Sequence, residues 1–185
     1  MDLKDAIYNR RSVRFFSNTP VEREKVDLLL QAAIQAPSAM NSQPWAFAVI
    51  KDVNLLKELS DRSKKYLLEN LDTVPVLAKY KNAFEKPEFN IFYNANCLVI
   101  IYAHEVHPGV VVDCSLAAQN LMLTAHSLGL GTCWIGFANT YLDLPEVMAE
   151  LNVPPDYKVI APIIVGYPRR TSPSTRNEPK ILFEK

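Results

Sequence analysis

The 185-residue sequence is poor in the residues that mark several classes of protein. It has three cysteines, Cys97, Cys114 and Cys133, which is an odd number, and they lie in apolar surroundings without metal-ligand spacing. This pattern argues against a disulfide framework and a metal site, and it predicts three reduced, buried thiols. The longest apolar run, residues 97–103, is far too short to span a bilayer.

The sequence also lacks an excess of either charge. Twenty Lys and Arg residues balance twenty Asp and Glu residues, so there is no electrostatic reason to expect nucleic acid or an anionic membrane as the main partner. The N-terminus, MDLKDAIYNRR, has no apolar core of signal-peptide length. We therefore expect a cytoplasmic protein.

The sequence is nevertheless 49% hydrophobic, which is enough for one folded domain spanning residues 1–185. The clearest helix covers about residues 20–36, where apolar residues recur every three and four positions. The motif TPVE at residues 19–22 predicts a capping box for this helix, with Thr19 as N-cap, and Pro37 predicts its end.

Other elements follow from the same kinds of pattern. Helices are expected at about 2–9, 53–71, 144–151 and 113–128, the last with Asp113 as N-cap and Gly129 at its end. Strands are expected at 45–50, 97–103, 132–137 and 158–168. Helices and strands mix without strict alternation, which favours an α+β fold with a sheet of four or five strands between helices.

Two short basic motifs stand out in this neutral chain. Arg10, Arg11 and Arg14 flank Ser12, and Arg169 and Arg170 follow the last predicted strand. Taken alone, the first motif is better explained as a solvated face at a helix end. The functional alternative is a phosphate site, because planar guanidinium groups and a hydroxyl can close on one anion. Two separate basic groups suit a small phosphorylated ligand better than a polymer.

The stretch APSAMNSQPWAF, residues 36–47, joins an apolar helix to an apolar strand with many short polar side chains. It could be a capped turn in which Ser38 and Asn41 bond their own backbone. The alternative, which we favour modestly, is a rigid set of donors and acceptors that faces a planar polar ligand.

The stretch GLGTCWIG, residues 129–136, also allows two interpretations. It could simply end a helix and begin a buried strand. Alternatively Cys133, Trp134, Ile135 and Gly136 pass close to a flat ligand, since glycine permits close backbone approach. No carboxylate pair or nucleophile–base set stands out, so an enzyme of this sequence would need a cofactor for the hard chemistry, and no side chain is expected to be catalytic.

Four blocks together resemble the FMN-dependent nitroreductase family: RRSVRFF, APSAMNSQPWAF, AAQNLMLTAHSLGLGTCWIGF and VIAPIIVGYPRR, in this order. The resemblance covers most of the chain and is weakest at residues 51–95 and in the tail. It implies a three-layer sandwich in an intertwined homodimer, with two FMN sites at the subunit interface.

The resemblance also implies roles for individual residues. Arg10, Arg11, Ser12 and Arg14 would hold the phosphate and ribityl chain, and Arg169 would close on the phosphate. The flavin ring would lie along Trp134, Ile135 and Gly136, beside Cys133. The partner subunit would contribute a third group of residues from the polar stretch, namely Pro37, Ser38, Ala39 and Asn41, with Gln43 nearby.

The reaction implied by the resemblance is ping-pong hydride transfer. NAD(P)H would reduce the flavin at N5 and leave, and a small acceptor such as a nitroaromatic or quinone would then be reduced. Residues 72–93 would form the substrate channel, and residues 169–185 an arm that docks on the neighbouring subunit. The channel residues are expected to be Tyr80, Phe84, Phe89 and Phe92. Two alternatives stay open: an alkene reductase or reductive dehalogenase on the same scaffold, and a slow flavin-binding or sensing protein.

Overall fold

The computed structural model describes residues 1–71, 75–104, 107–171 and 173–185. Its middle layer is a four-stranded antiparallel sheet with the order β1-β2-β4-β3. The strands are β1 (Trp45–Ile50), β2 (Cys97–His104), β3 (Gly131–Trp134) and β4 (Tyr157–Gly166). The predicted positions of all four strands are therefore confirmed, although β3 is shorter than expected.

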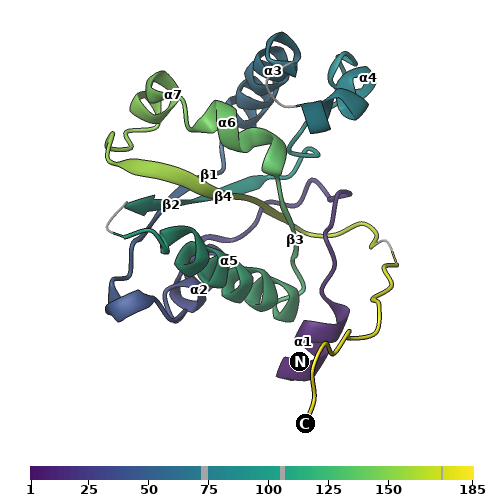
Figure 1. Ribbon diagram of the computed structural model, residues 1–185. Coiled ribbons are helices and arrows are strands. Elements are labelled where there is room, and N and C mark those ends of the chain that lie inside the picture. Colours follow the sequence, from purple (N-terminus) through teal and green to yellow (C-terminus); the bar gives the residue numbers. More distant parts are fainter. Residues whose placement is uncertain (72–74, 105–106, 172) are drawn as a thin grey trace.

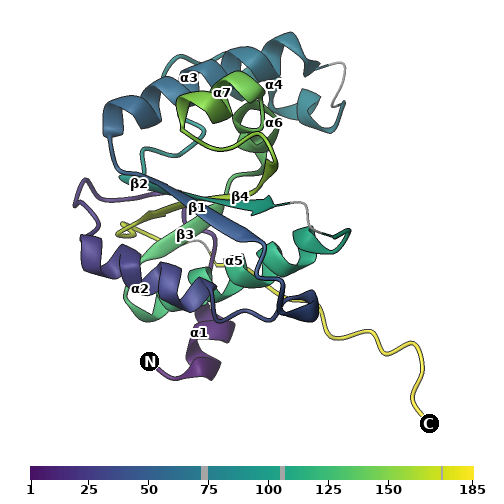
Figure 2. The ribbon, with the colours of Figure 1, turned by 90° about the vertical axis from the view of Figure 1, so that its left-hand side faces the viewer.

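Helices cover both faces of the sheet (Figures 1 and 2). One face carries α1 (Leu3–Asn9), α2 (Arg23–Ala33) and α5 (Val110–Ser127). The other carries α3 (Val53–Glu69), α4 (Lys81–Phe84), α6 (Asn139–Leu142) and α7 (Pro145–Glu150). Short 3-10 turns lie at Ala39–Asn41, Pro75–Tyr80 and Gly136–Ala138. The predicted α+β three-layer sandwich is confirmed.

The central strand β2 explains why both helical layers are needed. Leu98, Ile100 and Tyr102 point into the apolar cluster beneath α3 and α6. The alternate residues, including Val99 and Ile101, point into the cluster beneath α2 and α5. Each fully buried Leu or Ile contributes about 1.5–3 kcal/mol relative to an exposed one, so uncovering either face would be costly.

The predicted capping box of α2 is wrong. The helix begins at Arg23, with Glu22 as an N-cap that makes no side-chain capping bond, and Thr19 precedes the helix. The Glu22 carboxylate instead accepts hydrogen bonds of 2.7 and 2.8 Å from the Tyr167 hydroxyl beyond β4. A contact between residues far apart in the sequence has displaced the local capping pattern.

Helix α5 begins at Val110, so Asp113 is not its N-cap but belongs to its first turn. Its C-terminal end is close to the prediction. Gly129 has a φ of +77°, and the Leu130 N–H donates to Ala125 O at 2.8 Å, which is a Schellman motif. The predicted strand over 132–137 is also too long, because Ile135 leaves the extended conformation and the Gly136–Ala138 turn follows.

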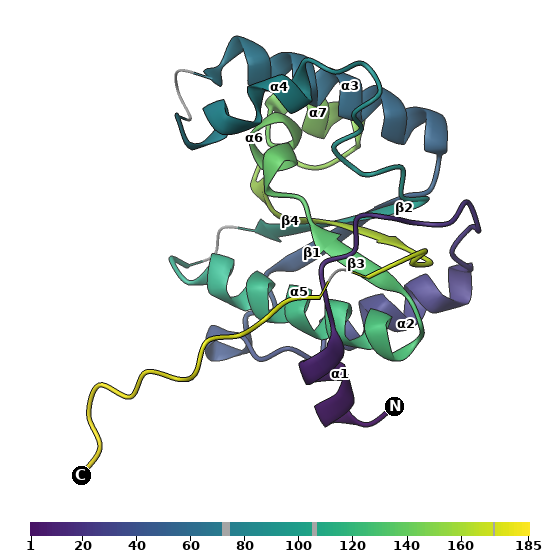
Figure 3. The same ribbon diagram turned by 90° about the vertical axis from the view of Figure 1, so that its right-hand side faces the viewer.

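The chain after Arg170 leaves the sandwich and runs past α1 as an extended arm (Figures 1 and 3). Its residues Ile181, Leu182 and Phe183 are exposed by 65, 85 and 80%. Exposure of three consecutive large apolar residues is unfavourable in water, and it leaves them available to another surface. No helix among the described residues has both the length and the apolar character needed to cross a membrane.

Candidate functional site

The N-terminal segment lies along the edge strand β3. Ser12 forms a parallel bridge with Thr132, and the Val13 N–H donates to Thr132 O at 2.9 Å. Gly131 is required for this approach, because a Cβ there would lie 2.6–2.9 Å from three side-chain carbons of Val13. This pairing brings the first basic motif beside the residues predicted to follow a flat ligand.

Cys133 marks the place where these two motifs meet. Burial raises the pKa of its thiol, while Arg14, a hydrogen bond with Ser12, and Arg10 act in the opposite direction. The side chains of Cys133 and Ile135 are 2% and 3% exposed, so they belong to the core. A ligand at this strand can therefore meet their backbone but hardly their side chains.

Gly136 lies two residues beyond the C-terminal end of β3 and is exposed. A Cβ added to Gly136 would meet no described heavy atom within 4 Å, so packing of the described chain does not require glycine here. The neighbouring Trp134 is only partly buried. Open space beside a glycine is what close approach by a flat ligand needs.

A cluster of cations lies around Arg10. Burial, followed by the charges of Arg176 and Arg11, lowers the pKa of Arg10. Burial and the charges of Arg10 and Arg11 also lower the pKa of His126, whose buried Nε2 has no hydrogen-bond partner among the described residues. An anion would reduce the repulsion between these cations, and it could accept a hydrogen bond from the ring nitrogen of His126. The cluster therefore fits a phosphate group.

Arg176 is a candidate that sequence reasoning missed, because the tail has no period and the residue stands alone. The predicted role of Arg169 at the phosphate stays a prediction: its backbone N–H donates to Phe15 O at 2.8 Å. Arg169 lines a cavity of about 350 Å³ together with Arg14 and Tyr93. Arg170 stacks 3.7 Å from the centre of the Phe15 ring.

The polar stretch lies in a different place, near the start of α5. The Ala39 N–H donates to the Asp113 carboxylate at 3.2 and 3.3 Å. His126, beside Arg10, lies near the other end of the same helix. His126 lies thirteen positions after Asp113 in the helix, which is roughly 20 Å at 1.5 Å per residue. One chain therefore keeps the two halves of the predicted site at opposite ends of α5.

The polar stretch is also exposed. Pro37, Ala39, Asn41 and Gln43 all face solvent, and Ser38 is partly buried. Ser38 Oγ accepts from the Gln43 N–H at 3.0 Å, and the Gln43 side-chain amide donates to Asn41 Oδ1 at 3.2 Å. The stretch is therefore an internally bonded turn, as the first interpretation expected, and it presents polar groups outward. That these groups face a planar ligand stays a prediction.

Aromatic rings form a continuous wall beside Gly136. Tyr80 and Phe84 each contact Phe137, with ring centres 4.8 and 5.4 Å apart. Phe89 lies 6.2 Å from Phe84 and 5.8 Å from Tyr93. The Arg14 guanidinium lies 5.8 Å from the centre of the Tyr93 ring, so the wall joins the glycine to the basic motif.

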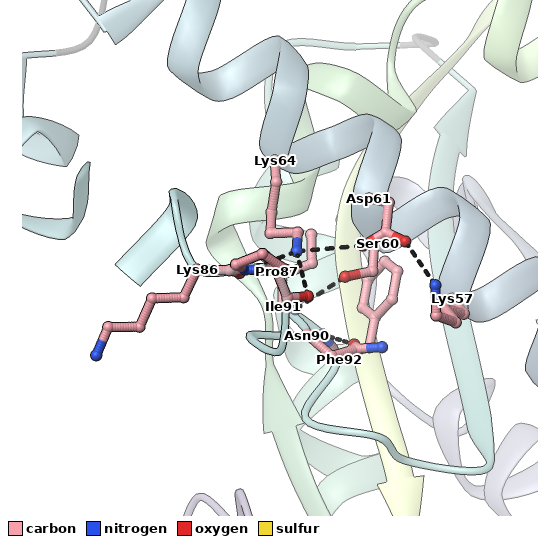
Figure 4. Close-up of polar contacts among 9 residues, drawn as sticks. All are labelled: Lys57, Ser60, Asp61, Lys64, Lys86, Pro87, Asn90, Ile91 and Phe92. Atoms are coloured by element: carbon pink, nitrogen blue, oxygen red, sulfur yellow. Dashed lines mark hydrogen bonds and ion pairs between the residues drawn. The ribbon is translucent and has the colours of Figure 1, made fainter. Parts of the chain in front are cut away.

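This wall is fastened to α3 by a polar network (Figure 4). Ser60 Oγ accepts from the Ile91 N–H at 3.0 Å. The ammonium group of Lys64, a residue 6% exposed, pairs with Asp61 at 3.1 Å and donates to two carbonyls of the segment, Lys86 O at 3.4 Å and Pro87 O at 3.3 Å.

Burial shows which predicted channel residues have a structural role. Phe84 and Phe92 are 2% and 0% exposed and belong to the core, whereas Tyr80 is exposed and Phe89 partly so. Phe84 and Phe92 therefore attach this part of the segment to the core. Residues 72–74 of the predicted channel segment lie outside the described residues.

The model of the Nitroreductase family matches residues 7–167 of the sequence. The chain belongs to this family. A curated relative from Archaeoglobus fulgidus, named "Putative NADH dehydrogenase/NAD(P)H nitroreductase", is 30% identical over 164 residues, which is 88% of this chain and 83% of the relative. The family assignment and the fold implied by the resemblance are thus confirmed.

Solved structures of Nitroreductase family proteins agree with this fold. A nitroreductase with bound FMN from Bacteroides fragilis is 27% identical, superposes with a TM-score of 0.88, and both chains are covered completely. A second relative has a different named activity: the iodotyrosine deiodinase of Thermotoga neapolitana is 28% identical over 95% of this chain and 94% of its own. Proteins similar to this chain therefore carry at least two different activity names.

Proposed function

We propose that the protein is an FMN-dependent NAD(P)H oxidoreductase that reduces a small acceptor such as a nitroaromatic or a quinone. The observation that carries this proposal is the cluster of Arg10, Arg11 and Arg176 with the unpartnered His126 nitrogen, at the end of the segment that pairs with β3. The family assignment and the FMN-bound relative from Bacteroides fragilis support the choice of cofactor.

The chain's residues would bind and orient rather than react. Arg10 and Arg176 would hold the phosphate as charge-assisted donors. Ser12 and Arg14 would reach the rest of the cofactor, and Gly136 would let a flat ring approach the backbone. The chemistry that FMN supplies when bound is hydride transfer through its N5 from NAD(P)H to the acceptor.

The acceptor would be selected by the aromatic wall. Tyr80 and Phe89 offer ring surface beside Gly136 and Phe137, and stacking on such rings orients a planar acceptor. Phe84 and Phe92 would act indirectly, by supporting these rings from the core. The proposal needs no nucleophile or general base from the protein.

The functional unit would be a homodimer that shares each FMN site. The two halves of the site lie at opposite ends of α5 in one chain, so a second copy would be needed to bring Ser38 and Asn41 to Arg10 and Ser12. Exposed apolar residues support this arrangement. They lie on α1 and α5 and in the arm: Leu3, Ile7, Val111, Val112, Leu116, Ile181, Leu182 and Phe183.

Reductive dehalogenation is the second candidate function, favoured by the relatives named iodotyrosine deiodinase. An anaerobic panel tests both candidates with the same FMN-loaded protein and excess NADH or NADPH. We expect nitroaromatics and quinones to be consumed faster than iodotyrosine or activated alkenes. Preferential halide release would instead assign the dehalogenase activity. Negligible turnover with every acceptor would favour the slow flavin-binding protein.

A further inference from the structure

Residues 38–43 hold an unfavourable backbone conformation. Met40, Asn41 and Gln43 have φ values of 52°, 55° and 47°, which is the left-handed region that residues other than glycine rarely adopt. Such conformations persist where surrounding contacts enforce them, and they cluster at functional sites. The bonds inside the loop are local, such as Asn41 N–H to Ser38 O at 3.0 Å.

Two residues near the start of α5 supply contacts from outside the loop: Asp113, which is buried, and His107, which is mostly buried. Asp113, which is 5% exposed, accepts from the Ala39 N–H with both carboxylate oxygens. His107 Nε2 lies 3.0 Å from Ser42 Oγ and 3.0 Å from Asp113 Oδ2. The ring of His107 therefore links the two anchors of the loop to each other.

The hydrogen-bond pattern assigns the form of this histidine. The Gly109 N–H donates to His107 Nδ1 at 3.0 Å, so Nδ1 is an acceptor and carries no hydrogen. The hydrogen of the neutral ring then lies on Nε2, where it faces the Asp113 carboxylate. The carboxylate consequently has a donor from each side, and it lies in the first turn of α5, where the helix dipole favours a negative charge.

We propose that Asp113 and His107 are positioning residues that hold the loop of residues 38–43 in the shape in which it binds FMN. The inference rests on the proposed function, which places Ser38 and Asn41 of this loop against the cofactor. Neither Asp113 nor His107 touches the cofactor in this account. Their effect is to prevent the strained loop from relaxing.

The test compares four variants of the full-length dimer by FMN titration. Asp113→Ala and His107→Ala should each raise the Kd for FMN about tenfold or more. The double variant should be little worse than either single one, because residues that act as a unit are not additive. His107→Gln keeps a side-chain N–H near the position of Nε2, so it should restore most of the affinity.

Two controls separate positioning from general stability. His104 and Asp156 form another His–carboxylate pair, 2.9 Å apart, whose side chains are exposed. Asp156→Ala should leave FMN binding unchanged. Riboflavin binding should fall as much as FMN binding in the Asp113 and His107 variants, since this loop does not reach the phosphate. Amide hydrogen exchange should quicken at residues 38–43, with α3 and β2 unchanged.

The outcomes distinguish this inference from the proposed function. Wild-type protein that binds no FMN would overturn the proposed function itself. If Asn41→Ala weakens FMN binding but Asp113→Ala and His107→Ala do not, the positioning role is wrong. If Asp113→Ala fails to fold, the comparison of His107→Ala with His107→Gln decides: equal affinities in these two variants would also contradict the positioning role.

Discussion

Arg176, in the C-terminal arm, lies close enough to Arg10, at the end of α1, for its charge to lower the pKa of the Arg10 guanidinium. The arm thus returns to the N-terminal basic motif although it forms no regular element. Like charges gathered at one place repel each other, and a nearby anion reduces that repulsion; the FMN phosphate is the anion in our account.

The first prediction concerns this pair. Arg10→Ala and Arg176→Ala should each weaken FMN binding by about 1.5–3 kcal/mol, the loss of a charge-assisted hydrogen bond. Riboflavin lacks the phosphate, so its affinity should hardly change. Arg169→Ala should have a smaller effect on FMN binding than Arg176→Ala. Arg23→Ala, which removes an exposed ion pair with Asp27, is the matched control. Equal losses for FMN and riboflavin would mean that the arginines only support the fold.

The second prediction distinguishes the accessible aromatic residues, Tyr80 and Phe89, from the buried Phe84 that supports them. Phe84→Ala should lower the free energy of unfolding by about 3–5 kcal/mol, as expected for a large buried ring. Tyr80→Ala and Phe89→Ala should cost far less stability but change the ratio of kcat/KM values between a nitroaromatic and a quinone. Thermal unfolding, FMN content and the acceptor kinetics of each variant measure these effects. Unchanged kinetics in the Tyr80 and Phe89 variants would show that these rings do not select the acceptor.

The third prediction concerns the arm. Leu182→Asp should weaken the dimer roughly tenfold or more if Leu182 is buried on the partner, since such a side chain contributes about 1.5–3 kcal/mol. The open edge of β1, with its partly buried residues 45–49, offers one surface for such an arm. Val53→Asp, at the start of α3, is the control, because Val53 is also an exposed apolar residue. Sedimentation at falling concentration measures the effect, and a dimer as tight as wild type would show that the arm does not dock.

The fourth prediction tests the shared site by mixing two inactive variants, one at Arg10 and one at Asn41. A heterodimer would hold one site with both changes and one with neither. Activity should therefore return to about half of wild type per heterodimer, on the site count of two-fold symmetry. Heterodimers that form but stay inactive would show that each site lies within one chain.

The sequence predicted the elements that rest on local periodicity. The helix of residues 113–128 and the strand of residues 97–103 were both found, because apolar spacing records which faces are buried. The prediction of helix caps failed where contacts between residues distant in the sequence determine the local structure. Asp113 has the chemistry of an N-cap, yet it binds Ala39, and Glu22 is engaged by Tyr167 instead of capping α2.

In the candidate site too, local motifs could be predicted from the sequence, whereas contacts between distant residues could not. Ser12, Arg14 and residues 133–136 form motifs, so the sequence could indicate them before their pairing along β3 was known. Arg176 and the Lys64 network carry no local signal, because their partners lie far away in the sequence. That the two halves of the site lie at opposite ends of α5 follows from the tertiary structure alone.

The most direct test of the central claim, flavin-dependent oxidoreduction, is the visible spectrum of the purified protein under anaerobic conditions. The account predicts a yellow protein that releases FMN on heat denaturation, loses its flavin absorbance when NADH or NADPH is added, and regains it when a nitroaromatic or quinone follows. Release of FAD, or a colourless protein that takes up no added FMN, would contradict the account. A flavin that NAD(P)H leaves oxidised would contradict it equally.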